Sequence, residues 1–131
     1  PFADRAALHA AMVAAVAQAG DATKVALIKA HPDLAGRVAR EGHLTAASAA
    51  EQAGAGLGAL TPQEIARFDA DNGAYRARFG FPFVICAREH TKASILAALA
   101  KRCANERAAE IATALAEIAK IARLRLEDAV N

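Results

Sequence analysis

The point at which the second predicted helix must end lies in the stretch Ala30 to Arg37, AHPDLAGR. Pro32 disfavours α geometry at the residue before it, so the helical pattern that leads into Ala30 stops at or near His31. We therefore expect the imidazole at a helix end, facing a loop. A carboxylate, a glycine and an arginine follow it closely. This is the densest polar chemistry in a chain that is otherwise rich in alanine, leucine and isoleucine.

Length and composition predict one all-helical domain. The chain has 131 residues, which is enough for a single hydrophobic core. Hydrophobic residues make up 55% and aromatic residues only 5%, and the abundance of alanine favours close-packed helices over sheets. We expect residues 1–131 to form one domain. Basic residues exceed acidic residues by two, which is too small a surplus to indicate a nucleic-acid-binding surface.

The spacing of apolar side chains predicts a bundle of about six helices. Their expected ranges are 4–19, 21–30, 45–57, 61–78, 91–104 and 105–130. The fourth has the strongest start signal, because Thr61, Pro62 and Glu64 combine a capping hydroxyl, a proline at the first helical position and a capping-box carboxylate. Residues 34–44 are expected to form a loop. The candidate caps or first residues of the other helices are Asp4, Asp21, Thr45, Thr91 and Asn105.

One segment breaks the helical pattern. Gly80 and Pro82 rule out a regular helix over residues 80–87, GFPFVICA. The sequence contains no second strand-like run with which this segment could pair. We predict an irregular, extended and buried connection near residues 80–88.

The sequence gives no signal for a membrane or an oxidising compartment. No apolar run reaches the roughly 20 residues needed to cross a bilayer, and no apolar signal core opens the chain. Cys86 and Cys103 show no CxxC spacing, and a helical domain of this size needs no disulfide. We therefore expect free thiols and a cytoplasmic protein.

His31 and Glu51 are the main candidates for proton chemistry, and the residues alone leave both open. The imidazole of His31 can pass a proton near neutral pH, but it can also serve only to satisfy the end of its helix. Ser48 and Glu51 match a capping box, which favours a structural role for the glutamate. If Thr45 caps that helix instead, Glu51 is free to face a cleft.

Other uses of the polar residues are weaker. A metal site has no HxxxH or HExxH spacing to support it, and its donors would be His31, Asp33, His43 and Glu51. Cys86 with His90 as its base would make a nucleophile, but an inert buried thiol is more common in an apolar run. Arg123 and Arg125 near the chain end suit a helix C-terminus, or one of them could form a fork for a carboxylate or a urea-like group.

Four pieces of sequence together resemble one enzyme family. They are HPDLAG, SAAEQ, GFPFVICA and IARLRL, in that order and at compatible spacings between Asp21 and Leu126. The family is that of 2-oxo-4-hydroxy-4-carboxy-5-ureidoimidazoline (OHCU) decarboxylase, from the pathway of urate degradation. Each piece is weak alone, whereas four in order are specific.

The resemblance implies an all-helical, generally homodimeric enzyme that needs neither a cofactor nor a metal. Members convert OHCU to (S)-allantoin and carbon dioxide. His31 would be the catalytic histidine and Glu51 the catalytic glutamate. The residues that would contact the substrate are Pro32, Ser48, Gln52, Phe83, Val84, Ile85, Cys86, Ala87 and Arg125.

The resemblance also leaves points open. The family usually carries a further N-terminal helical segment ahead of the position of Pro1, and we expect this chain to lack it. The alternatives to the decarboxylase are a helical partner-binding module, a metallohydrolase and a protein that binds a ureide without decarboxylating it.

Overall fold

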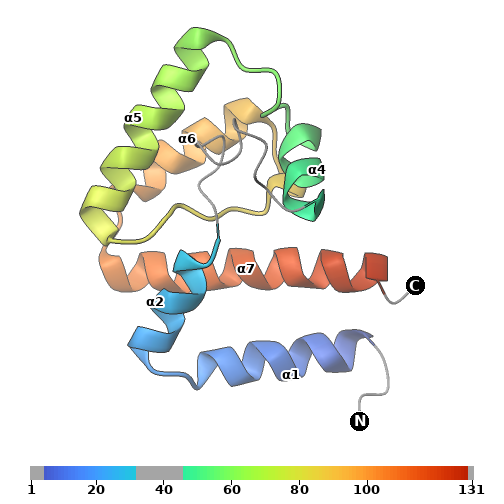
Figure 1. The fold of residues 1–131 in the computed structure, drawn as a ribbon. Coiled ribbons are helices and arrows are strands. Elements are labelled where there is room, and N and C mark those ends of the chain that lie inside the picture. Colours follow the sequence, from blue (N-terminus) through green and yellow to red (C-terminus); the bar gives the residue numbers. More distant parts are fainter. Residues whose placement is uncertain (1–4, 32–45, 130–131) are drawn as a thin grey trace.

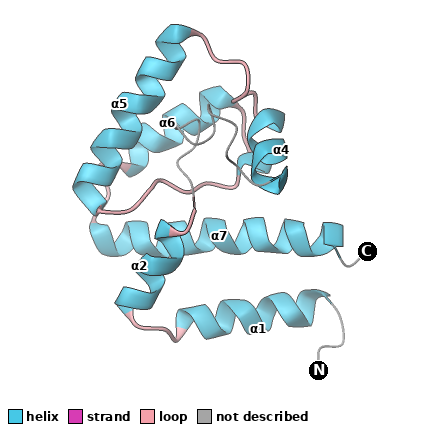
Figure 2. Ribbon diagram, viewed as in Figure 1, coloured by secondary structure: helices cyan, strands magenta, loops and turns pink. Residues whose placement is uncertain are grey.

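The computed structural model describes residues 5–31 and 46–129, and these residues are almost entirely helical. Within them no segment forms a β-strand (Figure 2). The predicted all-α fold of about six helices is confirmed. The helices are α1 (Arg5–Ala17), α2 (Asp21–Lys29), α4 (Ala46–Gly54), α5 (Pro62–Phe79), α6 (Lys92–Arg102) and α7 (Arg107–Ala129), with a 3-10 turn η1 (Ala87–Glu89).

Helix α7 runs through the middle of the fold (Figure 1). Helices α1 and α2 pack against it on one side, while α4, α5 and α6 lie on the other. The connection from α5 to α6 follows α7 before it reaches η1, which packs against α4. The last helix therefore contacts the N-terminal helices on one side and the connection between α5 and α6 on the other.

Helix α2 ends where the proline was expected to stop it. Its last residue is Lys29, and the amide of His31 donates to the carbonyl of Ile28 at 3.1 Å, which closes the final turn. The prediction that Asp21 caps this helix is wrong, because Gly20 is the N-cap and Asp21 is already helical. Its carboxylate still suits the positive end of the helix dipole. The predicted cap Asp4, the cap Thr45 and the loop 34–44 lie outside the described residues.

Helices α5 and α6 begin at the predicted caps. Thr61 and Glu64 form both hydrogen bonds of the capping box, at 2.9 and 3.1 Å. Thr91 caps α6 in the same way, with Ser94 in place of the carboxylate. Gly80 ends α5 with a φ of 78°, a left-handed conformation that glycine adopts without a Cβ clash.

The connection predicted to be irregular and buried near residues 80–88 is buried from Phe81 to Ala87, whereas Gly80 and Arg88 at its ends are exposed. The segment is not helical before η1. Phe81 and Phe83 each meet the ring of Tyr75 on α5 edge-on, with centroids 6.1 and 5.4 Å apart. Phe79 stacks on Phe81 at 5.8 Å. These aromatic rings form the centre of the core.

A buried polar network ties α5, α6 and α7 together around Glu110, whose exposed fraction is 0%. Its carboxylate accepts hydrogen bonds from Tyr75 at 2.5 Å, from Arg102 Nε at 2.9 Å and from Asn105 at 2.9 Å. Burial and the bond to Glu110 raise the pKa of Tyr75, so its hydroxyl remains a donor. The prediction that Asn105 caps the last helix is wrong, because α7 begins at Arg107 and the Asn105 amide instead serves Glu110.

Candidate functional site

Glu51 and Arg125 form a two-point ion pair between α4 and α7. The Nη2 and Nε atoms of Arg125 donate to the two oxygens of Glu51 at 2.7 and 3.1 Å. Only 10% of the Glu51 side chain is exposed, against 38% for Arg125. Arginine forks that hold both oxygens of a carboxylate fix its orientation as well as its charge. Two candidates that are 74 residues apart in sequence therefore meet.

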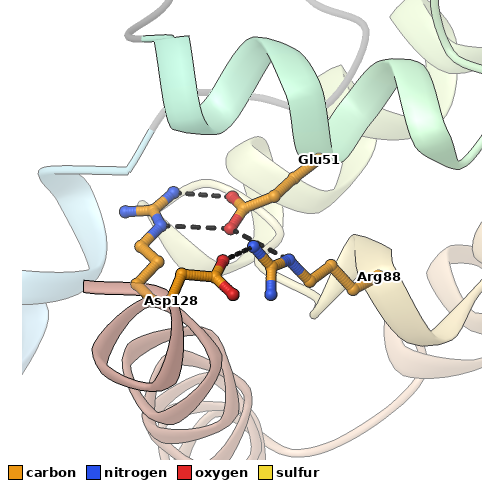
Figure 3. Close-up of polar contacts among 4 residues, drawn as sticks. Glu51, Arg88 and Asp128 are labelled. Atoms are coloured by element: carbon orange, nitrogen blue, oxygen red, sulfur yellow. Dashed lines mark hydrogen bonds and ion pairs between the residues drawn. The ribbon is translucent and has the colours of Figure 1, made fainter. Parts of the chain in front are cut away.

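Two further charged side chains complete this cluster. Arg88 on η1 places its Nε 3.8 Å from Glu51 Oε2, and its Nη2 donates to Asp128 Oδ2. Figure 3 shows Glu51, Arg88 and Asp128 converging from α4, η1 and the last turn of α7. We call these residues, together with Arg125, the charge cluster. It balances two guanidiniums with two carboxylates.

His31 is half-buried at the end of α2, and one of its ring nitrogens has a partner. Nδ1 lies 3.1 Å from the carbonyl oxygen of Leu27. A carbonyl can only accept, so Nδ1 must carry the proton, and the neutral ring then presents Nε2 as an acceptor. His31 therefore does satisfy a carbonyl at the end of its helix, which is the structural role that the sequence offered as the alternative to catalysis. This bond occupies Nδ1 and defines the Nδ1–H tautomer, in which Nε2 carries no proton.

The remaining candidates divide into three groups. Pro32 lies outside the described residues. Ser48 is on α4, but only its backbone is described, while Gln52 on the same helix is buried. The segment Phe83–Ala87 is buried throughout and leads directly into η1.

Two backbone groups of that segment are held by buried charges. The carbonyl of Val84 accepts from Arg102 Nη1 at 2.7 Å, and the amide of Cys86 donates to Glu117 Oε1 at 3.1 Å. Buried amide and carbonyl groups in an irregular segment need such partners, because no helix or sheet pairs them with each other. These two bonds fix the path of the segment and satisfy both backbone groups.

The Glu117 carboxylate remains charged although it is buried. Burial opposes its ionisation, but the hydrogen bonds from Lys120 and from the Cys86 amide outweigh it and lower the pKa of Glu117. The Glu117–Lys120 contact is 2.8 Å. For the thiol of Cys86, burial and the nearby carboxylates of Glu89 and Glu117 raise the pKa. A thiol with a raised pKa is a poor nucleophile.

The lowered pKa of Glu117 predicts a pH-dependent contribution to stability. Because the folded-state pKa lies below that of the unfolded chain, about 4.3, the stabilisation is present above that pH and is lost as the pH falls through the folded value. Glu117→Gln cannot ionise. We expect its deficit in the free energy of unfolding to be largest above about pH 5 and to shrink toward pH 3. Urea unfolding of both proteins across this range measures the difference, and a deficit that stays constant would contradict the assignment.

The sequence predictions did not include the buried anchors Arg102, Glu110 and Glu117, nor Arg88 and Asp128 in the charge cluster. A signal for the two glutamates was present. Glu110 and Glu117 fall in register with Ala114 and Ile121 at alternating spacings of four and three, which places them on the face that α7 buries. Acidic residues on that face indicate buried partners.

Of the four donors considered for a metal site, Asp33 and His43 lie outside the described residues. Across 5–31 and 46–129, three or more His, Cys, Asp or Glu side chains never group closely enough to hold a metal ion. His90, the candidate base for Cys86, directs Nδ1 to the hydroxyl of Ser94 at 3.0 Å. No helix in the described parts of the chain is long and apolar enough to cross a membrane.

The fold is similar to that of helical enzymes known from solved structures. A crystal structure of OHCU decarboxylase in the presence of (S)-allantoin superposes with a TM-score of 0.78 and 26% identity over 98% of this chain and 82% of that one. The sequence model for OHCU decarboxylase matches residues 1–127. The chain belongs to the OHCU decarboxylase family, a family of decarboxylases.

Named relatives agree with this assignment. The OHCU decarboxylase of Amia calva is 44% identical over 131 residues, which is 100% of this chain and 75% of that protein. That of Mus musculus is 45% identical over 102 residues, 78% of this chain and 57% of that protein. The chain thus spans between about half and three quarters of the length of these relatives.

Proposed function

We propose that this chain decarboxylates OHCU to (S)-allantoin and carbon dioxide, without a cofactor, in urate degradation. The single observation that carries the proposal is the two-point pair between Glu51 and Arg125. The family resemblance implies that Glu51 is catalytic and that Arg125 binds the substrate, although each also had an ordinary structural explanation. Their meeting from different helices supports a common site.

The substrate itself supplies the means to lose carbon dioxide. Its carboxylate is attached to a carbon next to a C=N bond. When the bond to the carboxylate carbon breaks, the electron pair moves into the C=N bond, and a proton must then arrive on one face of the ring. The protein therefore has to supply a proton donor and acceptor, a rigid grip and a chiral surface.

His31 is proposed as the residue that exchanges a proton with the hydroxyl or the ring of the substrate. The bond from Nδ1 to the Leu27 carbonyl supports this role, since it fixes the ring and assigns Nε2 as the reacting nitrogen. A neutral Nε2 accepts a proton in one step and returns it in a later one.

Glu51 and Arg125 are proposed to hold the substrate beside that imidazole. Arg125 would grip anionic or ureido oxygens through its fork, while Glu51 would orient the ligand. The residues proposed to complete the contacts are Pro32, Ser48, Gln52 and the segment Phe83–Ala87. The rigid path of that segment supports its use as a template for a flat, amide-rich ring.

Several properties remain predictions that follow from the family. These are a homodimeric assembly, a cytoplasmic location and a single domain over residues 1–131. Size-exclusion chromatography with light scattering measures the molar mass in solution and so tests the homodimer directly.

The test of the function is direct turnover. Purified chain is mixed with freshly generated OHCU, and (S)-allantoin is followed by circular dichroism against the slow spontaneous decay, which gives no excess of one enantiomer. We expect a rapid, enantioselective signal that a metal chelator does not reduce. Loss of activity with the chelator would favour the metallohydrolase. If the chain binds allantoin saturably while OHCU decays at its spontaneous rate, the chain is a non-catalytic ureide-binding protein.

A further inference from the structure

Arg125 carries two duties in the proposed reaction, and they compete. Its Nε and Nη2 atoms already bind the two oxygens of Glu51. An incoming substrate carboxylate meets a guanidinium whose charge Glu51 already balances. Two carboxylates near one cation repel each other, so Glu51 needs a second cation if it is to stay in place while Arg125 turns to the substrate.

Arg88 is placed to be that cation. Its Nε is 3.8 Å from Glu51 Oε2, the same oxygen that accepts from Arg125 Nε. The side chains come from different directions, since Arg125 extends from α7 and Arg88 from η1. Glu51 therefore lies between two guanidiniums, and only one of them is assigned to the substrate.

Asp128 explains why Arg88 points toward Glu51. The side chain of Arg88 is 36% exposed, and a long exposed cation has many rotamers to occupy. Asp128 accepts from Nη2 of Arg88, which lies on the same edge of the guanidinium as the Nε that faces Glu51 (Figure 3). Because the Asp128 side chain is 59% exposed, this pair is weak. It orients Arg88 rather than fixing it.

We infer that Arg88 is a positioning residue for Glu51, and that Asp128 orients Arg88. The inference rests on the proposed function. When the substrate carboxylate takes a share of Arg125, Arg88 retains the Glu51 carboxylate next to η1. Since η1 continues the Phe83–Ala87 segment, Glu51 keeps its place relative to the surface proposed to hold the ring.

The kinetic test compares Arg88→Gln, Arg88→Lys and Asp128→Asn in the turnover assay. Arg88→Gln is expected to lower kcat about tenfold or more, because small displacements of a catalytic group are costly, while KM changes by less than about twofold. Arg88→Lys keeps the charge and should recover most of the loss. Asp128→Asn should lower kcat in the same direction by less than Arg88→Gln.

The matched control is Arg67→Gln, which removes an exposed arginine paired with Asp71 along α5. It should leave both kcat and KM at their wild-type values. A wild-type kcat for Arg88→Gln would overturn the inference. A raised KM with unchanged kcat would also overturn it, because Arg88 would then bind the substrate directly.

A second measurement separates this inference from the proposed function. Urea unfolding midpoints are compared for Glu51→Gln, Arg88→Gln and the double variant at low salt, where coupling between the two side chains makes the shifts non-additive. Additive shifts would overturn the contact itself, whether or not the chain turns over OHCU. An inactive wild-type protein with non-additive shifts would refute the decarboxylase and retain the contact.

Discussion

The variant His31→Gln is expected to fold normally and to lose on the order of 10²–10⁴-fold in kcat, the usual contribution of a positioned proton-transfer group. Glutamine can donate its amide to the Leu27 carbonyl as Nδ1 does, so the end of α2 should persist. The glutamine side chain has no group that takes up or releases a proton near neutral pH. Stopped-flow or circular dichroism measurements of OHCU turnover give kcat, and thermal unfolding verifies the fold.

The control for this variant is His9→Gln. His9 lies on α1, where Nε2 is 2.7 Å from the carbonyl of Ala119 on α7, and it has no part in the proposed site. Its replacement should keep wild-type kcat. If His31→Gln turned over OHCU at the wild-type rate, the proton-transfer role would be refuted.

The largest effect on stability is expected for Glu110→Ala. The substitution removes the acceptor of three buried hydrogen bonds and leaves Arg102, which is 8% exposed, without its carboxylate. Breaking a buried ion pair by removing one partner costs about 3–5 kcal/mol. Arg102 also lies over the ring of Phe83 at 4.4 Å, so the loss should reach the segment that it supports. The free energy of unfolding from urea titration measures the effect.

Two companion variants make the stability prediction specific. Glu106→Ala removes an exposed carboxylate at the start of the same helix and should change the free energy of unfolding by less than about 0.5 kcal/mol. Glu110→Gln keeps an acceptor and should fall between wild type and alanine, which keeps the test usable if the alanine variant does not fold. A loss below about 1 kcal/mol for Glu110→Ala would contradict the role assigned to the network.

The parts of the fold that depend on local chemistry were predictable from the sequence. The Thr61–Glu64 box, the stop imposed by Pro32 and the break at Gly80 each act over a few residues, and the structure has all three. The errors at Asp21 and Asn105 are also local. Both are acceptable caps by type, but α2 is capped by Gly20, one residue earlier, and α7 begins only at Arg107.

The polar anchors of the core could not be predicted because they depend on which helices meet. Arg102 and Glu110 are close in sequence, but the bonds from Arg102 to the Val84 carbonyl and from the Cys86 amide to Glu117 depend on how the irregular segment lies against α6 and α7. Sequence patterns report which face is buried and not which backbone atom it meets.

In the candidate site, too, the residues alone did not predict which side chains meet. From the residues alone, Glu51 was better explained as part of a capping box and Arg125 as a cation at a helix end. Only the family resemblance favoured a shared site, and the structure joins the two side chains. Whether His31 works beside them remains a prediction.

Helix α7 sets one further constraint on how this chain can vary. It carries Glu110, Glu117 and Arg125 on one continuous helix, and 15 residues of helix place the first and last of them about 22 Å apart. A single-residue insertion between Glu117 and Arg125 would turn the guanidinium by about 100° and leave both glutamates in place. Changes in length should therefore be tolerated at exposed connecting residues such as Gly58 and Ala59, and should be selected against within this helix.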